Sequence, residues 1–241
     1  KTYYAEKSGI DVKNIVSVSI MPCTAKKAEA VRPEFSTNGI QDVDYVLTTR
    51  ELGRMIKEAG IDFAALPAEQ YDAPFGISTG AGVIFGSSGG VMEAALRTVA
   101  EVVTGKPLES IEFTAVRGLA GIKEAAVPIG DLTVKIAVAN TLSNARIMMD
   151  KIRAGEADYQ FIEIMACPGG CIGGGGQPVP VCEETRLNRI AAIYECDQDS
   201  QIRKSHENPA VKELYDTWLG QPLGEKSHHL LHTHYKAQIR C

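Results

Sequence analysis

The chain has 241 residues, of which 44% are hydrophobic and 23% charged, and its formal net charge is -5. This is the composition of a globular protein, long enough for one large core or two smaller ones. The acidic balance gives no indication of a nucleic-acid partner, and no run of ~18 apolar residues is present that could span a membrane.

The first part of the chain predicts two strands, each followed by a helix. Apolar residues alternate with Ser and predict a strand over Ile15 to Ile20, and the segment TAKKAEAVR predicts a helix soon after it. Cys23 would then lie at the turn between strand and helix. A second strand is predicted over Tyr45 to Leu47, and Thr48-x-x-Glu51 forms a candidate capping box for the helix that follows.

The middle of the chain mixes strand and helix patterns. The segment GISTGAGVIFGSSGG predicts a Gly/Ser loop, and a helix is predicted over Val91 to Val103, with Gly105 ending it. Three strand-like runs follow, IEFTAVRG, IKEAAVPIG and LTVKIAVAN, and then an amphipathic helix in LSNARIMMDKIRAG. A last strand, YQFIEIMAC, would end in Cys167. Open α/β sheets place their sites at the carboxyl ends of strands, where Cys23 and Cys167 are expected.

These patterns predict an α/β fold with a parallel or mixed sheet flanked by helices. The last quarter of the chain differs, because TRLNRIAAIYECD, NPAVKELYDTWLG and EKSHHLLHTHY all have helical patterns. Asn208 followed by Pro209 is a typical helix start. We therefore expect a helical C-terminal tail.

The segment IMACPGGCIGGGGQP is the sharpest chemical feature. Cys167 and Cys171 are separated by three residues and are followed closely by four consecutive glycines. Thiolates bind soft metals and iron–sulfur clusters, and glycine lets the backbone approach them closely. Zinc sites more often pair cysteines two apart and repeat the pair, which favours a different metal site here. The alternative is a chance pair of thiols in a flexible turn.

Cys23 and Lys26 form a second candidate pair. Cys23 precedes a predicted helix, whose N-terminus can stabilise a thiolate. Lys26, three residues further on, would project near it and could hydrogen-bond an anionic ligand. The alternative is a solvent-facing lysine on a lysine-rich helix.

Taken together, MPCTAKKAE, FGSSGGVMEAALRT and IMACPGGCIGGGGQP, with RKSHENPAV and LLHTHY in the tail, resemble the iron-only ([FeFe]) hydrogenases over essentially the whole chain. The resemblance implies an enzyme that reversibly reduces protons to H2 at an H-cluster. This cofactor is a [4Fe–4S] cubane joined through a cysteine sulfur to a two-iron unit that carries CO, CN and a bridging dithiolate. Residues 1–184 would be the C-terminal part of the H-cluster domain, and residues 185–241 a tail like the hydrogenase small subunit, packed on the same domain.

The resemblance also implies roles for single residues. Cys23 and Cys167 match cubane ligands, and Cys171 matches the ligand that also bridges to the two-iron unit. Lys26 matches the residue that hydrogen-bonds a cyanide of that unit. The residues that match cavity positions around it are Met21, Pro22, Phe85, Met165 and Gln177. Methionine and phenylalanine would supply polarizable walls that do not titrate, although ordinary core methionines are the alternative.

One cubane ligand of the family lies in a Thr-Ser-Cys-Cys-Pro motif, next to the proton-relay cysteine, and this motif does not occur here. We therefore expect the chain to be the C-terminal portion of a longer subunit whose upstream part supplies that ligand. Among the other cysteines, Cys182 is the nearest substitute, Cys196 is expected to be a small core residue, and Cys241 is expected to be mobile.

Two further patterns are interpreted as structural. His228 and His232 are spaced i, i+4 and could bind a metal, but a polar helix face is the simpler interpretation. Glu93 and Arg97, also i, i+4, predict an ion pair within one helix.

Two other functions remain as alternatives, a hydrogenase-like iron–sulfur protein in cluster assembly or sensing, and a structural zinc or free-thiol protein. The continuous tail resembles single-chain cytoplasmic hydrogenases. That resemblance implies a cytoplasmic location and electron partners such as ferredoxin or NAD-linked subunits.

Overall fold

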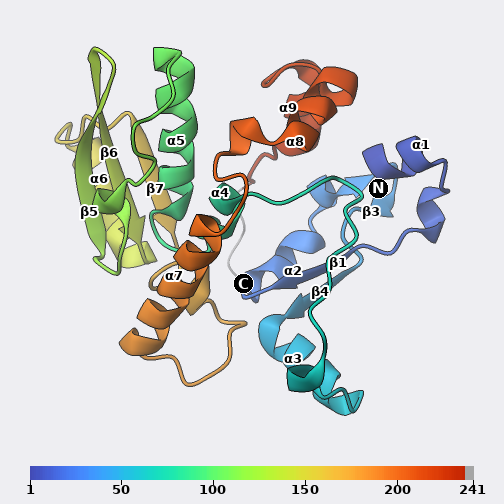
Figure 1. The fold of residues 1–241 in the computed structure, drawn as a ribbon. Coiled ribbons are helices and arrows are strands. Elements are labelled where there is room, and N and C mark those ends of the chain that lie inside the picture. The colour runs from blue at the N-terminus through green and yellow to red at the C-terminus, as the bar shows by residue number, and fades with distance from the viewer. Residues whose placement is uncertain (237–241) are drawn as a thin grey trace. The chain divides into compact units, whose positions relative to one another are not determined.

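The computed structural model describes residues 1–236. Two compact units are present, one formed by Lys1–Ile77 together with the segment from Pro209 onward, the other by Ser78–Asn208. Most helices and strands of both are labelled in Figure 1. The division at residues 184 and 185 that the resemblance implies stays a prediction.

The first unit contains two small sheets and short helices. Strand β1 pairs with β4 in parallel, and β2 pairs with β3 in an antiparallel manner. The strands are β1 (Val18–Met21), β2 (Ser36–Thr37), β3 (Ile40–Gln41) and β4 (Tyr45–Thr48). The helices are α1 (Tyr3–Ser8), α2 (Ala25–Ala30), α3 (Thr49–Glu58), α8 (Pro209–Leu214), which continues as a π-helix over Tyr215–Leu219, and α9 (Glu225–Leu231).

The strand predicted over Ile15 to Ile20 begins three residues later than expected. A 3-10 turn over Val12–Asn14 precedes it, and the first residue pair of the sheet joins Val18 to Tyr45. The N–H of Ser17 is already taken by the Asp44 carboxylate at 2.7 Å. The start of β4 therefore limits where β1 can begin.

The predicted capping box of α3 is confirmed. The Glu51 N–H donates to Thr48 Oγ1 at 3.2 Å, and the Thr48 N–H donates to a Glu51 carboxylate oxygen at 2.7 Å. The hydrogen bond from Thr48 N–H, together with an ion pair to Lys27, lowers the pKa of Glu51 to about 2. A reciprocal cap of this kind satisfies two N–H groups that the first turn leaves open.

The second unit is built on a three-stranded mixed sheet. The strands, in the order β5-β6-β7, are β5 (Ile122–Ile129), β6 (Leu132–Asn140) and β7 (Phe161–Met165). Strands β5 and β6 are antiparallel, whereas β6 and β7 are parallel. The helices are α4 (Gly80–Val83), α5 (Gly90–Thr104), α6 (Leu142–Arg153) and α7 (Glu183–Gln198). The predicted α/β class is confirmed.

Side chains of β6 point alternately to the two faces of the sheet and so contribute to two separate hydrophobic cores of this unit. Ile136 and Val138 pack with Met92 and Leu96 of α5 on one face of the sheet (Figure 1). The residues between them, Ala137 and Ala139, pack with Met148 of α6. Because successive strand side chains point to opposite faces, a helix covers each face of this sheet. A third core joins the residues Ala81, Ile84, Ala94 and Tyr194 of the helical segments.

Two predictions in this unit are wrong. The expected Gly/Ser loop instead contains α4 and a 3-10 turn over Ile84–Gly86, because Ala81 and Ile84 are buried against Tyr194. The expected strand IEFTAVRG contains only a 3-10 turn over Thr114–Val116. Its backbone is held by α5, since Arg97 Nε donates to the Ile111 carbonyl at 3.0 Å.

Two smaller corrections concern cysteines. Strand β7 ends at Met165, two residues before Cys167, because its last partner is Asn140, the final residue of β6. Cys196 is exposed rather than a core residue, since the buried positions of α7 are Tyr194 and Asp197. Cys241 lies outside the described residues.

Candidate functional site

The first unit carries four of the expected site residues on one strand-to-helix turn. Met21 ends β1, Pro22 and Cys23 form the turn, and Lys26 lies in α2. Cys23 is a half-buried free thiol at the predicted position. The Lys26 ammonium forms an ion pair with Glu29 one turn further on, and its side chain is 42% exposed. The lysine is therefore partly accessible but already has a carboxylate partner.

The second unit carries Cys167 and Cys171, the two remaining cysteines expected as ligands, on a loop of residues 166–177, which we call the cysteine loop. Its backbone is a chain of consecutive tight turns, closed by hydrogen bonds of 2.9–3.0 Å. In these bonds Gly170, Gly173, Gly174 and Gln177 donate to the carbonyls of Cys167, Gly170, Cys171 and Gly174. Cys167 is half-buried and Cys171 is exposed. The loop is thus an ordered structure and not a loose turn.

Two glycines of the cysteine loop, Gly170 and Gly173, are required by packing. Gly170 has a φ of +97°, and a Cβ there would lie 2.6 Å from the backbone nitrogen of Ser88. A Cβ on Gly173 would collide with the carbonyl oxygen of Pro168. These positions leave no room for a side chain, so glycine is needed for close backbone approach as well as for its conformational freedom.

Residues 86–89, GSSG, which we call the serine turn, form the support behind this loop. The Ser88 N–H donates to the Gly169 carbonyl at 2.9 Å. The Gly169 N–H faces the buried Asn140 side-chain oxygen at 3.5 Å. Phe85 directly precedes the serine turn and is 46% exposed. Within the second unit, Cys167, Cys171 and Gln177 therefore belong to the loop, Met165 ends the strand that enters it, and Phe85 adjoins its support.

Sequence reasoning missed the buried polar side chains under the loop. Lys123, Asn140 and Glu163 are 8%, 3% and 6% exposed, respectively, and all lie on the strands of the sheet. The available signal was charge inside two otherwise apolar runs, Lys123 next to Glu124 in IKEAAVPI and Glu163 in FIEIM. Charges are rarely buried unless they have a specific partner, so both positions were informative.

Each unit carries thiols of the kind that bind iron–sulfur clusters. Cys23 lies in a turn of the first unit, Cys167 and Cys171 lie in the cysteine loop of the second, and thiolates are the usual ligands of such clusters. Cys182 is also free and exposed, but its thiol lies 3.1 Å from the Thr185 hydroxyl at the start of α7. The side-chain and backbone hydrogen bonds with Thr185 lower the pKa of Cys182.

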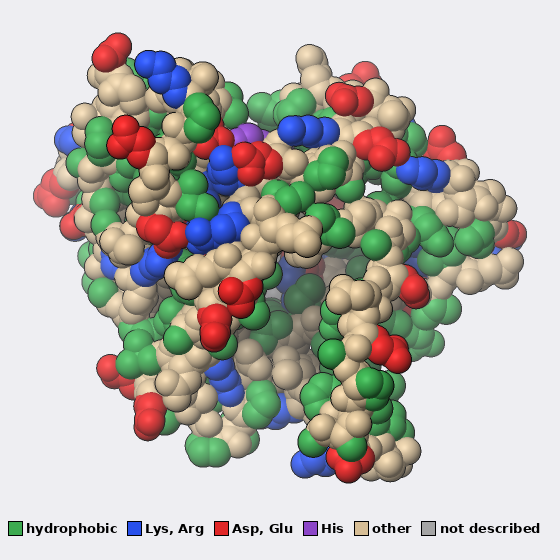
Figure 2. Space-filling view, viewed as in Figure 1, with side chains coloured by type: hydrophobic (Ala, Val, Ile, Leu, Met, Phe, Trp, Pro, Cys, Tyr) green, Lys and Arg blue, Asp and Glu red, His purple; other side chains and the backbone are tan. Residues whose placement is uncertain are grey.

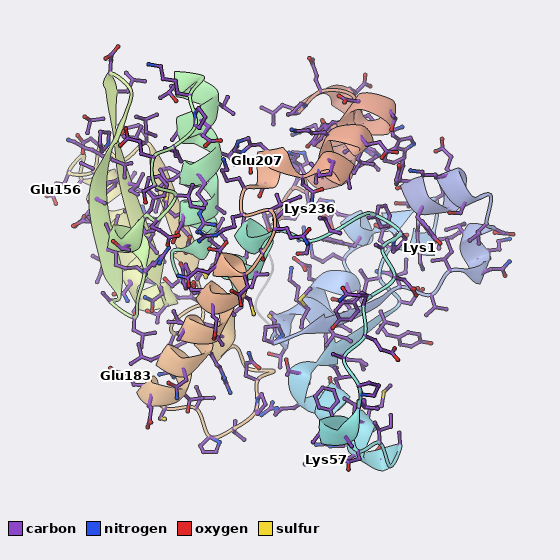
Figure 3. The ribbon with its side chains drawn as sticks, viewed as in Figure 1. Lys1, Lys57, Glu156, Glu183, Glu207 and Lys236 are labelled. Atoms are coloured by element: carbon purple, nitrogen blue, oxygen red, sulfur yellow. The ribbon has the colours of Figure 1, made fainter. Side chains whose placement is uncertain are left out.

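A second group of possible metal ligands consists of Glu101, His206 and Glu207, whose ligand atoms lie within 4.8 Å of one another. Lys204 already pairs with Glu101 at 2.9 Å and with Glu207 at 2.6 Å. Glu207 is labelled in Figure 3, in the segment between α7 and α8. The lysine ammonium supplies the positive charge that a cation would bring, so this group is an ion-pair network.

Among residues 1–236, the histidines at the C-terminal end of α9 and the surface charges give no second site. The exposed rings of His228 and His232 stack with centroids 4.8 Å apart. Acidic and basic side chains are interspersed over the face shown in Figure 2. Among the described residues, no helix combines the length and the apolar character that a membrane crossing needs.

Comparisons with known proteins identify the same family that the sequence motifs resemble. A family model described as iron only hydrogenase large subunit, C-terminal domain, matches residues 1–175. The model of the iron hydrogenase small subunit matches residues 183–238.

The NADP-reducing hydrogenase subunit HndD of Solidesulfovibrio fructosivorans is 54% identical over 98% of this chain and 40% of its own length. Iron hydrogenase 1 of Clostridium pasteurianum is 46% identical over 98% of this chain and 42% of its own length. The chain therefore spans about two fifths of these curated relatives.

Solved structures and a more distant relative complete the comparison. A variant of [FeFe]-hydrogenase HydA1 from Chlamydomonas reinhardtii is 47% identical, with a TM-score of 0.81 over 97% of this chain and 66% of that one. Cytosolic iron-sulfur assembly component 3 of Rattus norvegicus is 31% identical over 98% of this chain and 51% of its own length. With the large-subunit model matching most of its length, the chain belongs to the iron-only hydrogenase family.

Proposed function

We propose that this chain is part of the catalytic region of an [FeFe]-hydrogenase and that it contributes to an H-cluster. The observation that carries the proposal is the ordered cysteine loop, which holds the thiols of Cys167 and Cys171 on a backbone of tight turns whose glycines at 170 and 173 leave no room for a side chain. Family membership supports an oxidoreductase with an iron–sulfur cofactor. When bound, the H-cluster supplies the redox chemistry that interconverts protons, electrons and H2.

The proposal assigns each protein group a separate task. Cys23 and Cys167 would hold the cubane, and Cys171 would hold both the cubane and the two-iron unit. The Lys26 ammonium would donate a hydrogen bond to a cyanide nitrogen, exchanging its Glu29 partner for an anionic ligand.

The remaining residues would form walls around the two-iron unit. Met21, Pro22, Met165 and Phe85 would exclude water without titrating, and Gln177 would close the end of the loop. An apolar shell of this kind controls solvent access and so tunes a metal centre.

The name of the relative from Solidesulfovibrio fructosivorans, an NADP-reducing hydrogenase subunit, supports redox partner subunits. We propose ferredoxin or NAD-linked subunits as electron partners, and a cytoplasmic location.

The test is Cys171→Ser in the cluster-loaded protein, followed by infrared spectroscopy. We expect the CO and CN bands of the two-iron unit to disappear and H2 turnover to fall by at least about 100-fold, because the bridging thiolate is lost. The matched control is Cys196→Ser, an exposed cysteine on α7, which should keep bands and turnover. Survival of the bands and of turnover in Cys171→Ser would refute the bridging role.

The second candidate is a role in iron–sulfur assembly without turnover, favoured by the 31% identical assembly component. It predicts a protein that binds an iron–sulfur cluster but never shows CO or CN bands, even after maturation. The same infrared measurement on the unmodified protein therefore separates the two functions.

A further inference from the structure

Two opposite charges lie in one row across the sheet of the second unit. Lys123 on β5 and Glu163 on β7 both pair with Val138, the residue between them on β6. Paired residues share a face of the sheet, so both side chains extend from the face that packs on α5. Removing two charges from water is costly, and good partners are needed to offset it.

Glu163 binds the start of α5. Its carboxylate accepts the Gly89 N–H at 2.6 Å and the Met92 N–H at 2.8 Å. The N-cap residue of α5 is Gly89, which has no side chain to cap the helix. Glu163 therefore supplies the cap from a neighbouring strand, and its charge suits the positive end of the helix.

Lys123, on β5 at the opposite end of this row from Glu163, binds the serine turn. Its Nζ donates to the Ser88 carbonyl at 2.9 Å, to the Ser88 hydroxyl at 3.2 Å and to the Gly118 carbonyl at 2.9 Å. All three donor positions of the ammonium are thus used. Lys123 and Glu163 together hold Ser88 and Gly89, two adjacent residues of one turn.

The serine turn in turn holds the cysteine loop. Ser88 donates its N–H to the Gly169 carbonyl, and Gly170 fits against the backbone of residues 86–88 with no space for a Cβ. A bonded path therefore runs from the two charges through Ser88 to the residues between Cys167 and Cys171. Among the described residues, the hydrogen bonds of the two charged side chains end on the serine turn, Met92 and Gly118, and their connection to the thiols is this path.

We propose that Lys123 and Glu163 are positioning residues that fix the serine turn and, through it, the placement and exposure of the Cys167 and Cys171 thiols before a cluster binds. The inference rests on the proposed function only in treating those thiols as ligands. Sites of this kind need their ligands held to within ~0.5 Å by supporting residues, which is the task that the charge row performs.

Burial lowers the pKa of Lys123 to about 8, an effect that the nearby Glu163 charge opposes. The ammonium is therefore present at pH 7 with its three donors. A methionine at this position would fill a similar volume but leave the Ser88 and Gly118 carbonyls without their donor.

The experiment measures alkylation of single cysteines by iodoacetamide in the metal-free protein, with mass spectrometry to separate the sites. In Lys123→Met we expect alkylation of the half-buried Cys167 to accelerate by about 5-fold or more, because local opening exposes it. Cys196, exposed on α7, serves as the internal reference and should keep its rate. Lys135→Met, which removes an exposed lysine paired with Asp158, is the matched control.

Two results would overturn the inference. One is an unchanged Cys167 rate in a folded Lys123→Met protein, and the other is an equal rise at Cys196, which would indicate general destabilisation. If Lys123→Met does not fold, Glu163→Gln tests the same row, since a neutral amide keeps the shape but lacks one acceptor oxygen. No iron is present in this assay, so its result is separate from that of the infrared test.

Discussion

Glu101 has an unusually complete set of partners for a carboxylate near the surface. It accepts the Leu108 N–H at 2.8 Å, lies 2.9 Å from Lys204 Nζ, and lies 2.8 Å from His206 Nε2. The backbone bond from Leu108 and the lysine together lower the pKa of Glu101 to about 2. The ionised form is therefore favoured in the folded protein over the unfolded chain.

This linkage predicts a pH-dependent effect of Glu101→Gln. At pH 7 the variant should lose about 1–2 kcal/mol of unfolding free energy, a figure reduced for solvent screening. Because the folded pKa lies below the unfolded one, the stabilisation is complete above about pH 5 and disappears as the pH falls toward 2. Urea unfolding at pH 7 and pH 3 is the measurement, and the difference in unfolding free energy between the unmodified protein and Glu101→Gln should be smaller at pH 3. Glu109→Gln, at an exposed position, is the matched control, and a stability loss of Glu101→Gln that is equal at both pH values would contradict the prediction.

Spacing in the sequence predicted only the local part of the charge network. The ion pair between Glu93 and Arg97 is confirmed, with an N–O distance of 2.9 Å between fully buried side chains. Arg117 and Asp197 extend the network and lie 24 and 100 residues from Glu93 and Arg97, respectively. No periodicity links such positions, because only the tertiary fold brings them together.

At the scale of elements, α5 and α7 are joined by a buried bidentate ion pair. Arg97 Nη1 and Nη2 donate to the two carboxylate oxygens of Asp197 at 2.8 and 2.9 Å. Asp197→Ala should lower the unfolding free energy by about 3 kcal/mol, because the guanidinium loses one of its two buried carboxylate partners. Asp199→Ala, one residue past the end of α7, should cost under about 0.5 kcal/mol. Chemical denaturation of both variants is the measurement. Equal losses of unfolding free energy in the two variants would contradict a stabilising role of the Arg97–Asp197 ion pair.

Elements with strong local signals were predictable. The capping box fixed the start of α3, and Gly105, with a φ of +64°, ends α5 as expected. The conformation of the segment IEFTAVRG was not predictable. Side chains of α5, Arg97 and Glu93, hydrogen-bond a backbone carbonyl and a backbone N–H of this segment that a strand would use for pairing. In the cysteine loop, spacing indicated the two thiols, but its support by the serine turn depends on contacts about 80 residues apart in the chain.

At the scale of the whole molecule, the second unit is one uninterrupted segment, whereas the first is made from two. The three apolar cores described above lie entirely within residues 78–208. In the first unit, by contrast, Trp218 Nε1 reaches Glu6 at 3.0 Å and Lys7 pairs with Glu213 at 3.2 Å, across more than 200 residues of chain. The second unit thus has what an independently folding segment needs.

A fragment of residues 78–208 should therefore fold alone, with a single cooperative thermal transition and dispersed amide NMR signals. The matching fragment of residues 1–77 lacks the partners supplied from Pro209 onward and should not unfold cooperatively. A molten 78–208 fragment, or a cooperative 1–77 fragment, would contradict this division.

The close fit of Gly170 against Ser88 also has a consequence for divergence between related chains. A Cβ at residue 170 would collide with backbone atoms of residues 86–88. A substitution changes only the side chain, so no substitution in residues 86–88 can remove this collision. Insertions, deletions or larger residues in either segment can then be accepted only with a compensating change in the other. We expect the sequences of the cysteine loop and the serine turn to change together among related chains, independently of the sequence between them.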